Sequence, residues 1–460
     1  MRPLSLSQIA GWCLARLVGD DSVVHAVGVD TRTLAPGSLY VALRGENHDG
    51  HDFCTQARAG GAQALLVERA VDVPLPQLVC ADTLVALGKI AAHLAQERRT
   101  RLIAITGSNG KTTTRTLTRA LLEQIDPQVW SNAGNRNNEV GLPLAVIDQP
   151  EDARLAVYEM GAGAPGDIAY LAAIARPSIA LVTNVAPAHL ERMGSLLGIA
   201  EAKAAIYDAL PQDGVAVINA DDAFALWFGE RVGRRSVLTF GLDASAQVRA
   251  TDLLPHEGGT RFTLHSPWGR AEAEVPLPGR HQVGNALAAA SLAMSAGVPL
   301  EAVARGLAEA RGVPGRLQAL RLVDGTVVLD DSYNANPGSV AAAIDALVAQ
   351  ARRSGAPAWL VLGDMRELGP GGAVLHAEVG QRAREAGVAR LLTVGELSRY
   401  AAQAFGPGGE HFADQSALLE RLNSRADGPL ILVKGSRGSR MDRVVAALAG
   451  RGEEGDNHAA

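Results

Sequence analysis

The sequence predicts an α/β protein of three domains with mainly parallel sheets. Short apolar runs rich in Val, Ile and Leu recur along the chain and are followed by helical stretches, as in strand–helix units of a parallel sheet. Polar residues gather directly after many of these runs, where the carboxyl ends of parallel strands form a ligand-binding edge. A length of 460 residues suits several domains of roughly 150 residues each. We expect domains over residues 1–98, 99–312 and 313–460.

The bulk composition narrows the class of function. The chain is 47% hydrophobic and 20% charged, which is typical of globular domains. Its 43 basic and 49 acidic residues give a net charge of −6, which argues against a nucleic-acid partner because such proteins carry a basic face. Cys13, Cys54 and Cys80 lack zinc-site or disulfide spacing and indicate thiols in a reducing cytoplasm. Because no 18-residue apolar run and no secretory pattern occur, we expect no membrane insertion.

The first domain begins with a predicted helix over Gln8–Leu17, for which Ser7 is a suitable N-cap. Strand-like runs follow at Ser22–Val29 and Ser38–Leu43. A polar segment comes after each run, and the second of them is dense in hydrogen-bonding groups.

Those two polar segments carry charged and hydrogen-bonding groups. On chemistry alone, Asp30 and Arg32 are best interpreted as an ion pair in a solvated turn, and a binding role is the alternative. His48 and His51 lie in the second segment, where they are either ligands or, more commonly for this spacing, plain surface residues.

The strongest local signal is the segment RLIAITGSNGKTTTRTL. Arg101–Thr106 predicts a strand buried on both faces, and Gly107 and Gly110 predict a tight turn before a helix. Backbone N–H groups of such a turn and helix start form an anion cradle. Lys111 would reach the β- and γ-phosphates, and Thr112 would offer its hydroxyl to Mg²⁺. The GxxGKT spacing is two residues shorter than the usual nucleotide loop, and an ordinary strand–turn–helix is the alternative.

Two further strands of the second domain end in chemically useful residues. Leu155–Met160 is an apolar run that ends at the carboxylate of Glu159, and Ile179–Val185 runs towards His189. In a parallel sheet both residues would reach the same edge as the phosphate loop, so metal or phosphate binding is predicted for them.

Lys203 is an anomaly in the predicted helix Ser195–Leu210. It falls on the apolar face, where an ammonium must be paired, neutralised or modified, or else must extend along its stem to solvent. Residues 234–275 predict antiparallel strands, and Asn285 precedes a predicted helix over Ala286–Ser295 as either a plain cap or a base-reading residue.

The third domain predicts a second doubly wound α/β unit. Its strand-like runs are Val327–Leu329, Leu360–Leu362, Leu391–Val394 and Leu430–Val433, and each is followed by polar residues and a helical stretch. No GxGxxG follows the first run, so a dinucleotide site is not expected.

These features together resemble the Mur ligases, and the likeness covers nearly all of the chain. The segments that carry it are TGSNGKTT, DTRTLAPGSLYVALRGENHDGHDF, AGNRNNEVGLP, NVAPAHLE, EAKAAIY, LPGRHQVGNALAA, VPGRL, DDSYNANP, LGDMRELG and VKGSRG. DDSYNANP is the sharpest, since other Mur ligases and the related folylpolyglutamate synthases differ there. The resemblance implies an N-terminal UDP-substrate domain, a central ATP-binding domain and a C-terminal Rossmann-like domain.

The resemblance also implies an activity. It indicates an ATP-dependent ligase of peptidoglycan precursor synthesis that adds D-alanyl-D-alanine to UDP-N-acetylmuramoyl-tripeptide through an acyl phosphate. A monomer with these small-molecule substrates, ATP and two Mg²⁺ ions is expected, and the third peptide residue is either lysine or diaminopimelate. The alternatives are a ligase for another amino acid and a nucleotide-binding switch protein, although the NKxD motif of such GTPases is absent.

Site roles follow from the resemblance position by position. The residues implied in ATP binding are Gly107, Ser108, Asn109, Gly110, Lys111, Thr112, Thr113, Asn285, Arg316, Asp331 and Asn336. Those implied in metal binding are Thr112, Glu159, His189 and a carbamylated Lys203, and the catalytic set is Lys111, Glu159, His189 and Lys203. Those implied in UDP-substrate binding are Asp30, Thr31, Arg32, Asn47, His48, His51, Asn135, Asn137 and Asn138. Those implied in binding the incoming amino acid are Lys434, Ser436 and Arg437. His189 is either a metal ligand or an electrostatic partner.

Overall fold

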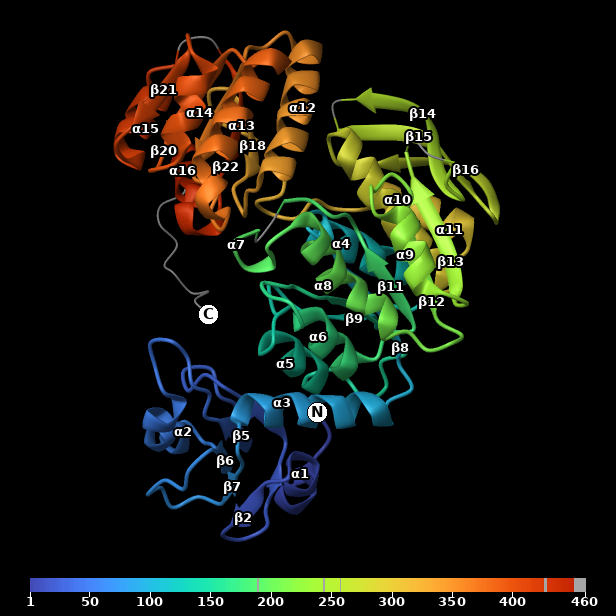
Figure 1. Ribbon diagram of the computed structural model, residues 1–460, viewed down its shortest axis with the longest axis vertical. Helices are drawn as coiled ribbons and strands as arrows, with labels where there is room; N and C mark the ends of the chain where they lie inside the picture. The colour runs from blue at the N-terminus through green and yellow to red at the C-terminus, as the bar shows by residue number, and fades with distance from the viewer. Residues whose placement is uncertain (188–189, 243–244, 257, 426–427, 451–460) are drawn as a thin grey trace.

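The computed structural model describes residues 1–187, 190–242, 245–256, 258–425 and 428–450. Figure 1 shows an N-terminal α/β region at the bottom, a central region in the middle and a C-terminal region at the top. The predicted three-domain α/β architecture is confirmed, whereas the boundaries after residues 98 and 312 stay predictions. Within the described ranges, no helix is both long and apolar enough to cross a membrane.

The N-terminal region is built on a mainly parallel sheet. Its elements are β1 (Leu4–Ser5), α1 (Leu6–Cys13), β2 (Arg16–Val18), β3 (Val23–Val24), β4 (Ala26–Gly28), β5 (Ser38–Val41), η1 (Gly50–Phe53), α2 (Cys54–Ala59), β6 (Ala64–Val67), β7 (Gln77–Val79) and α3 (Thr83–Glu97). The sheet order is β2-β7-β6-β5-β4, in which only β2 runs antiparallel to its neighbour. The polar segments after β4 and β5 therefore leave the same edge of this sheet.

The first helix differs from its prediction. It starts at Leu6 and not at Gln8, because the hydroxyl of Ser5 accepts the backbone N–H of Gln8 at 3.2 Å and so acts as the N-cap. The predicted cap, Ser7, lies inside the helix and donates its hydroxyl to Asp21 at 2.6 Å. Leu14 ends the helix in the left-handed conformation with φ +56°, and the residues after it form β2.

The central region contains the longest sheet. Its elements are β8 (Arg101–Thr106), α4 (Lys111–Leu122), β9 (Trp130–Ser131), α5 (Gly141–Ile147), β10 (Leu155–Glu159), α6 (Asp167–Ala175), β11 (Ile179–Val182), α7 (Leu190–Met193), α8 (Leu196–Asp208), β12 (Val215–Asn219), α9 (Ala225–Val232), β13 (Ser236–Gly241), β14 (Val248–His256), β15 (Gly259–Ser266), β16 (Gly269–Val275), α10 (Arg280–Ser295) and α11 (Leu300–Ala308). The order is β16-β15-β14-β13-β12-β11-β8-β10-β9. The antiparallel prediction for residues 234–275 is right for β14 to β16 and wrong for β13, which runs parallel to β12.

Alternating side chains of β8 enter different cores, which explains why this strand is apolar throughout. Leu102 and Ala104 pack with α5, α6 and α8, whereas Ile103 and Ile105 pack with α4, α10 and α11. The strand is thus fixed on both faces, and the loop that follows it starts from a rigid base.

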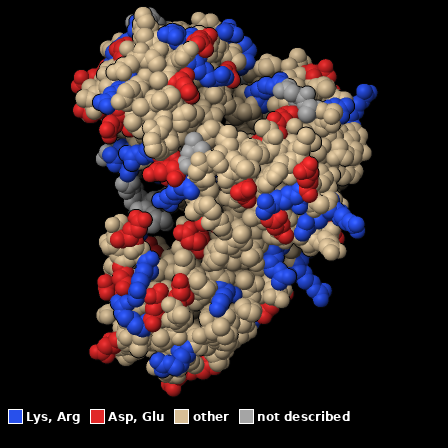
Figure 2. All heavy atoms as spheres, in the orientation of Figure 1, with Lys and Arg blue, Asp and Glu red and all other residues tan. Residues whose placement is uncertain are grey.

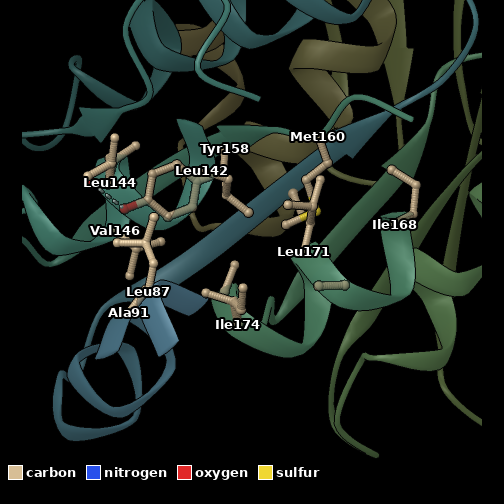
Figure 3. Packing of buried hydrophobic residues seen from close by; sticks show 14 of the residues in the cluster. Leu87, Ala91, Leu142, Leu144, Val146, Tyr158, Met160, Ile168, Leu171 and Ile174 are labelled. Carbon is tan, nitrogen blue, oxygen red and sulfur yellow. Dashed lines mark hydrogen bonds between the residues drawn. The ribbon is translucent and has the colours of Figure 1, made fainter. Parts of the chain in front are cut away.

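Helix α3 joins the N-terminal region to the central one. In Figure 3, Leu87 and Ala91 of α3 lie close to Leu144 and Val146 of α5, and Ile174 of α6 lies beside them. The same buried cluster includes Leu6 and Ile9 of α1, so one core extends across the seam. Because residues of both regions are buried in this one cluster, packing holds the N-terminal region to the central one in addition to the chain connection.

The C-terminal region is a second α/β unit. Its elements are β17 (Gln318–Arg321), β18 (Val327–Asp331), α12 (Pro337–Ser354), β19 (Ala358–Gly363), η2 (Gly369–Gly371), α13 (Gly372–Ala386), β20 (Arg390–Val394), α14 (Ser398–Phe405), β21 (Gly409–Phe412), α15 (Gln415–Asn423), β22 (Leu430–Lys434), η3 (Arg437–Ser439) and α16 (Met441–Leu448). The order is β17-β18-β22-β19-β20-β21, and only β17 is antiparallel. The predicted strands are confirmed, and β17 and β21 were not predicted. The carboxyl ends of β18 and β22 lie side by side and carry polar residues.

Candidate active site

A polar cavity of about 920 Å³ lies where the central and C-terminal regions meet. Its central-region walls are the loop after β8, the segments after β10 and β11, and the start of α10. Its C-terminal walls are the ends of β18 and β22 and the start of α12. The carboxyl edges of two sheets therefore face one space, as the sequence pattern predicts for each sheet separately.

The loop between β8 and α4 has the backbone of a tight anion cradle. Gly107 has φ +146°, and a Cβ there would overlap the side chain of Thr183, while Gly110 has φ +79°. The N–H of Ser108 donates to Asn184 O at 2.9 Å, and the N–H of Asn109 donates to Asn184 Oδ1 at 3.0 Å. Asn184, two residues after β11, therefore fixes the shape of the loop.

Lys111 begins α4 and lines the cavity. Its Nζ donates to Gly107 O at 2.8 Å and to Ser108 O at 3.4 Å, so it lies folded over the loop. Burial lowers the pKa of Lys111, and the nearby carboxylate of Glu159 opposes that shift. A polyphosphate in the cradle would offer this ammonium an anionic partner in place of two carbonyls.

Glu159 is the buried acid of the cavity, with 3% of its surface exposed. Its Oε2 accepts the hydroxyl of Thr112 at 2.7 Å, and its Oε1 accepts the side-chain amide of Asn137 at 2.8 Å. Arg115 lies 3.7 Å from Oε2. Asn132 holds the strand end with a bond to Glu159 N at 3.0 Å and another to Glu159 O at 3.0 Å. Arg115 and Asn132 were not predicted, because nothing in a local motif pairs them with a strand end far along the chain.

The oxygen atoms around Glu159 fit a hard cation. A carboxylate beside a threonine hydroxyl offers the one or two protein ligands with which Mg²⁺ is usually held next to phosphates. Among the described residues, no group of three His, Cys, Asp or Glu side chains forms an all-protein metal cage. His189 lies outside the described residues, so its metal role stays a prediction.

Lys203 on α8 is buried, with 2% of its surface exposed. The alternative in which it extends to solvent is therefore wrong. Burial, with a smaller contribution from the like charge of Lys111, lowers the pKa of Lys203 to about 7. Lys203 does not itself line the cavity, but it is near enough to Lys111 for the two charges to interact.

The nucleotide side of the cavity draws on both regions. Asn285 lies inside α10, because the helix begins at Arg280. The predicted helix start at Ala286 and the cap role of Asn285 are therefore wrong, whereas its base-reading role stays a prediction. Its amide oxygen lies against Gly110, at a distance from Thr114 Oγ1 of 3.5 Å. Asn336 of the C-terminal region donates to Asn109 Oδ1 at 2.7 Å. This bond ties the phosphate loop directly to the opposite wall.

The three residues predicted to bind the incoming amino acid lie in different surroundings. Lys434 is buried and donates to Asp331 Oδ2 at 2.5 Å and to Asn334 O at 2.9 Å. Ser436 is buried, donates to Ala335 O at 3.1 Å and does not line the cavity, so its contacts are structural. Arg437 lines the cavity and remains largely exposed.

The cavity wall holds both predicted and unpredicted residues. The predicted ones include Arg316, Asn135, Asn137 and Asn138, and the unpredicted ones include His281, Arg192 and Tyr333. Tyr333 was within reach of sequence reasoning because it lies in DDSYNANP, between two residues that were selected.

The predicted UDP-substrate residues of the N-terminal region do not line this cavity. Arg32 donates to Asp30 at 2.6 Å and 2.9 Å, which is the predicted ion pair, and both lie in the turn after β4 with Thr31. His48 and Asn47 are exposed. His51 is buried, with Nδ1 at 2.6 Å from Asp49 Oδ1 and Nε2 accepting Glu68 N at 2.9 Å. The surface interpretation of His51 is therefore wrong, because both ring nitrogens hold the loop in place.

The face drawn in Figure 2 shows basic and acidic side chains interspersed over the molecule. The drawn face therefore lacks the continuous basic patch that is typical of nucleic-acid-binding proteins.

Replacing Asn336 tests the bond between the two walls. Asn336 also caps α12, so Asn336→Ala should lower the free energy of unfolding by about 1 kcal/mol. Asp414→Ala removes the equivalent cap of α15, which lies outside the cavity, and is the matched control. Only Asn336→Ala should raise the KM for ATP, by roughly fivefold or more because it also loses the bond to Asn109. Equal KM values in both variants would contradict a nucleotide role for Asn336.

A phosphate loop at the edge of a parallel sheet, facing a second α/β region across a polar cavity, defines a nucleotide-binding protein in which two regions share one site. Three family models match the chain: "Mur ligase family, catalytic domain" over residues 23–102, "Mur ligase middle domain" over 105–293, and "Mur ligase, glutamate ligase domain" over 315–437. The chain belongs to the Mur ligase family.

Individual relatives are similar over almost the full chain. The UDP-N-acetylmuramoyl-tripeptide--D-alanyl-D-alanine ligase of Escherichia coli is 44% identical over 98% of this chain and 100% of its own. The crystal structure of MurF from Acinetobacter baumannii superposes with a TM-score of 0.92 at 30% identity, over 98% and 100% of the two chains. MurF from Thermotoga maritima, solved in complex with ADP, gives a TM-score of 0.82 at 28% identity over 93% and 97%.

Proposed function

We propose that this protein is the ATP-dependent ligase that adds D-alanyl-D-alanine to UDP-N-acetylmuramoyl-tripeptide in peptidoglycan synthesis. The observation that carries this function is its end-to-end similarity to the Escherichia coli ligase, at 44% identity. The cavity supports it, because the phosphate loop and the C-terminal wall with Arg437 open into one space. The ADP in the Thermotoga maritima relative supports ATP as the nucleotide.

The chemistry requires activation of a carboxylate, which is a poor acyl donor at neutral pH. An oxygen of the tripeptide's terminal carboxylate attacks the γ-phosphorus of ATP, ADP leaves, and an acyl phosphate forms. The uncharged amine of D-alanyl-D-alanine then attacks the acyl carbon. The tetrahedral intermediate expels phosphate, and the amine nitrogen loses its proton as the amide forms.

This chain's residues would stabilise the charge that moves in the first step. Lys111 and Arg316, which both line the cavity, would hold the phosphates in a partly enclosed site that strengthens such interactions. Thr112 and Glu159 would hold one Mg²⁺, and His189 with a carbamylated Lys203 would help to hold a second. Bound Mg²⁺ supplies charge neutralisation on the phosphate oxygens.

The substrates would extend from the cavity in opposite directions. Asn135, Asn137 and Asn138 would line the path of the peptide or sugar, and the turn with Asp30, Thr31 and Arg32 would hold the UDP group together with Asn47 and His48. Arg437, held beside Lys434 and Ser436, would bind the incoming dipeptide. His51 would act through the loop that it holds.

Further properties of the proposed enzyme follow from the same interpretation. It is a cytoplasmic monomer with domains over residues 1–98, 99–312 and 313–460. Because an acyl phosphate hydrolyses in water, closure of the C-terminal region on the central region would protect it.

The direct test is phosphate release with ATP, UDP-N-acetylmuramoyl-tripeptide and a panel of amines. D-alanyl-D-alanine should support release and single amino acids should not, with lysine- and diaminopimelate-containing tripeptides compared as acceptors. Turnover with a single amino acid in preference to the dipeptide would replace this function by that of another ligase. No turnover with any amine would leave a nucleotide-binding protein.

Arg32→Ala should raise the KM for the UDP substrate by about tenfold or more, because a guanidinium bond to a phosphate would be lost, and should leave the KM for ATP within about twofold. Arg58→Ala is the control, since Arg58 is an exposed arginine of the same region, on α2. Similar increases in both KM values for Arg32→Ala would place the UDP site elsewhere.

A further inference from the structure

Tyr333 lies close to two guanidinium groups in the cavity wall. Arg316 Cζ is 4.3 Å from the centroid of its ring, and Arg437 Cζ is 5.8 Å from the same centroid. The three residues come from different segments, namely the connector before β17, the turn after β18 and the start of η3. All three line the cavity, so one aromatic ring contacts two cations that come from different segments of the cavity wall.

The ring contacts both arginines, and among the described residues neither of them has a strong ion pair. In the part of the chain that the structure describes, Arg316 has no carboxylate within 4.0 Å, and Arg437 has only Asp442 at 3.6 Å. Both partners of that ion pair are largely exposed, with 58% and 41% of their side-chain surfaces in solvent, so it contributes little to holding Arg437. The aromatic face is therefore the main orienting contact of Arg316, and for Arg437 it adds to a weak ion pair.

The ring itself is held by backbone contacts. Tyr333 N donates to Gly315 O at 3.1 Å, and Gly315 has φ +72°. A Cβ on Gly315 would lie 3.3 Å from Tyr333 Cβ, so the two segments are in close contact at this point. Arg316 follows Gly315 directly, which means that the same backbone pairing sets both the ring and one of its cations.

Two like charges at one ring repel each other unless an anion lies near them. The positive field extends further, because Arg316 contributes to lowering the pKa of both Lys111 and Arg115. The reactants of the proposed ligase include such anions: the phosphates of ATP and the carboxylate of the incoming dipeptide. The arrangement thus fits two anionic groups that must be brought together.

We propose that Tyr333 is a positioning residue whose ring orients Arg316 towards the phosphates of ATP and Arg437 towards the carboxylate of D-alanyl-D-alanine. The role assigned to Arg437 rests on the proposed function, whereas the role assigned to Arg316 requires only that the cavity binds nucleotide. The contacts that carry this proposal are those of the ring, and the comparison of Tyr333→Phe with Tyr333→Leu separates the ring from the hydroxyl.

The test compares Tyr333→Leu, which removes the ring, with Tyr333→Phe, which keeps it. Tyr333→Leu should raise the KM for both ATP and D-alanyl-D-alanine by roughly five- to thirtyfold, with a smaller change in kcat, whereas Tyr333→Phe should restore both KM values. Tyr400→Leu is the matched control, because Arg399 Cζ lies 4.9 Å from the ring of Tyr400 outside the cavity. It should leave both KM values unchanged.

A double-mutant cycle separates positioning from a general loss of structure. If Tyr333 acts through Arg437, Tyr333→Leu should raise the KM for the dipeptide much less in an Arg437→Ala background than in the unmutated protein. Fully additive effects would overturn the proposal, as would a Tyr333→Phe variant as impaired as Tyr333→Leu. Should Tyr333→Leu fail to fold, Tyr333→Met carries the same comparisons.

Calorimetric binding of a non-hydrolysable ATP analogue distinguishes this inference from the proposed function. Tyr333→Leu should bind the analogue more weakly than the unmutated protein whether or not ligation occurs. An unmutated protein that binds nucleotide but does not ligate the dipeptide would refute the function and leave the role of Tyr333 towards Arg316 standing. Unchanged analogue binding in Tyr333→Leu would refute that role.

Discussion

Lys111→Ala is expected to abolish ATP-dependent ligation while the protein stays folded. The ammonium lies over the phosphate loop, and its hydrogen bonds are to two carbonyls of that loop, Gly107 O and Ser108 O. Its removal therefore breaks no ion pair of the core. The variant would lack the cation that is proposed to lie nearest the transferred phosphoryl group. Its kcat is therefore expected to fall by about 10³-fold or more.

The measurement is phosphate release at saturating substrates, with the thermal unfolding midpoint as the check of the fold. Lys89→Ala is the matched control, since Lys89 lies on α3 and does not line the cavity. It should retain the unmutated rate. Ligation by Lys111→Ala at a rate near that of the unmutated protein would remove Lys111 from the catalytic set.

Much of the central fold could be predicted because local pattern and tertiary environment agree there. The apolar run Arg101–Thr106 is β8 residue for residue, since both of its faces are covered by helices. Helix α8 was also predicted closely: the predicted range Ser195–Leu210 exceeds the observed Leu196–Asp208 by one residue at its start and two at its end, and Ser195 is the N-cap. The first helix was displaced because Ser5 and Ser7 are both suitable caps, and only the contact with Asp21 distinguishes them.

The site was predictable where one segment carries both the backbone shape and the side chain. The loop with Gly107 and Lys111 is such a segment, and so is the strand that ends at Glu159. Partners from distant segments were not predictable: Asn132 and Arg115 meet Glu159 only because β9, β10 and α4 pack together. The contact of Asn336 with Asn109 likewise depends on how two separate sheets face each other.

Lys203→Ala is expected to lose ligation by on the order of 10²-fold or more, because a buried group that helps to neutralise phosphate chemistry would be removed. A lysine with a pKa near 7 is substantially uncharged at neutral pH. An uncharged amine adds to CO₂ and gives up a proton, which yields a carbamate anion. Such an anion would stand beside the positive charge of Lys111 and could bind metal, whereas an ammonium there cannot.

Chemical rescue is the decisive measurement. Short carboxylic acids such as formate or acetate should restore part of the rate of Lys203→Ala, because they place an oxygen anion in the space that the side chain leaves. Lys111→Ala is the control from the same site and should not respond, since the charge it lacks is positive. In the unmutated protein, ¹³C-bicarbonate should give a carbamate resonance that is absent from Lys203→Ala.

The pH dependence of stability gives an independent reading of the same residue. The pKa of Lys203 is about 7 in the folded protein, against 10.5 for an exposed lysine. Between these values the unfolded chain binds the additional proton, so in CO₂-free buffer the free energy of unfolding should rise with pH across that window. Lys203→Met should remove this rise and be more stable at neutral pH.

Rescue without a labelled carbamate would mean that an anion is needed but that Lys203 does not supply it. Failure of both rescue and labelling would leave Lys203 as a buried uncharged amine and would remove it from the proposed metal site.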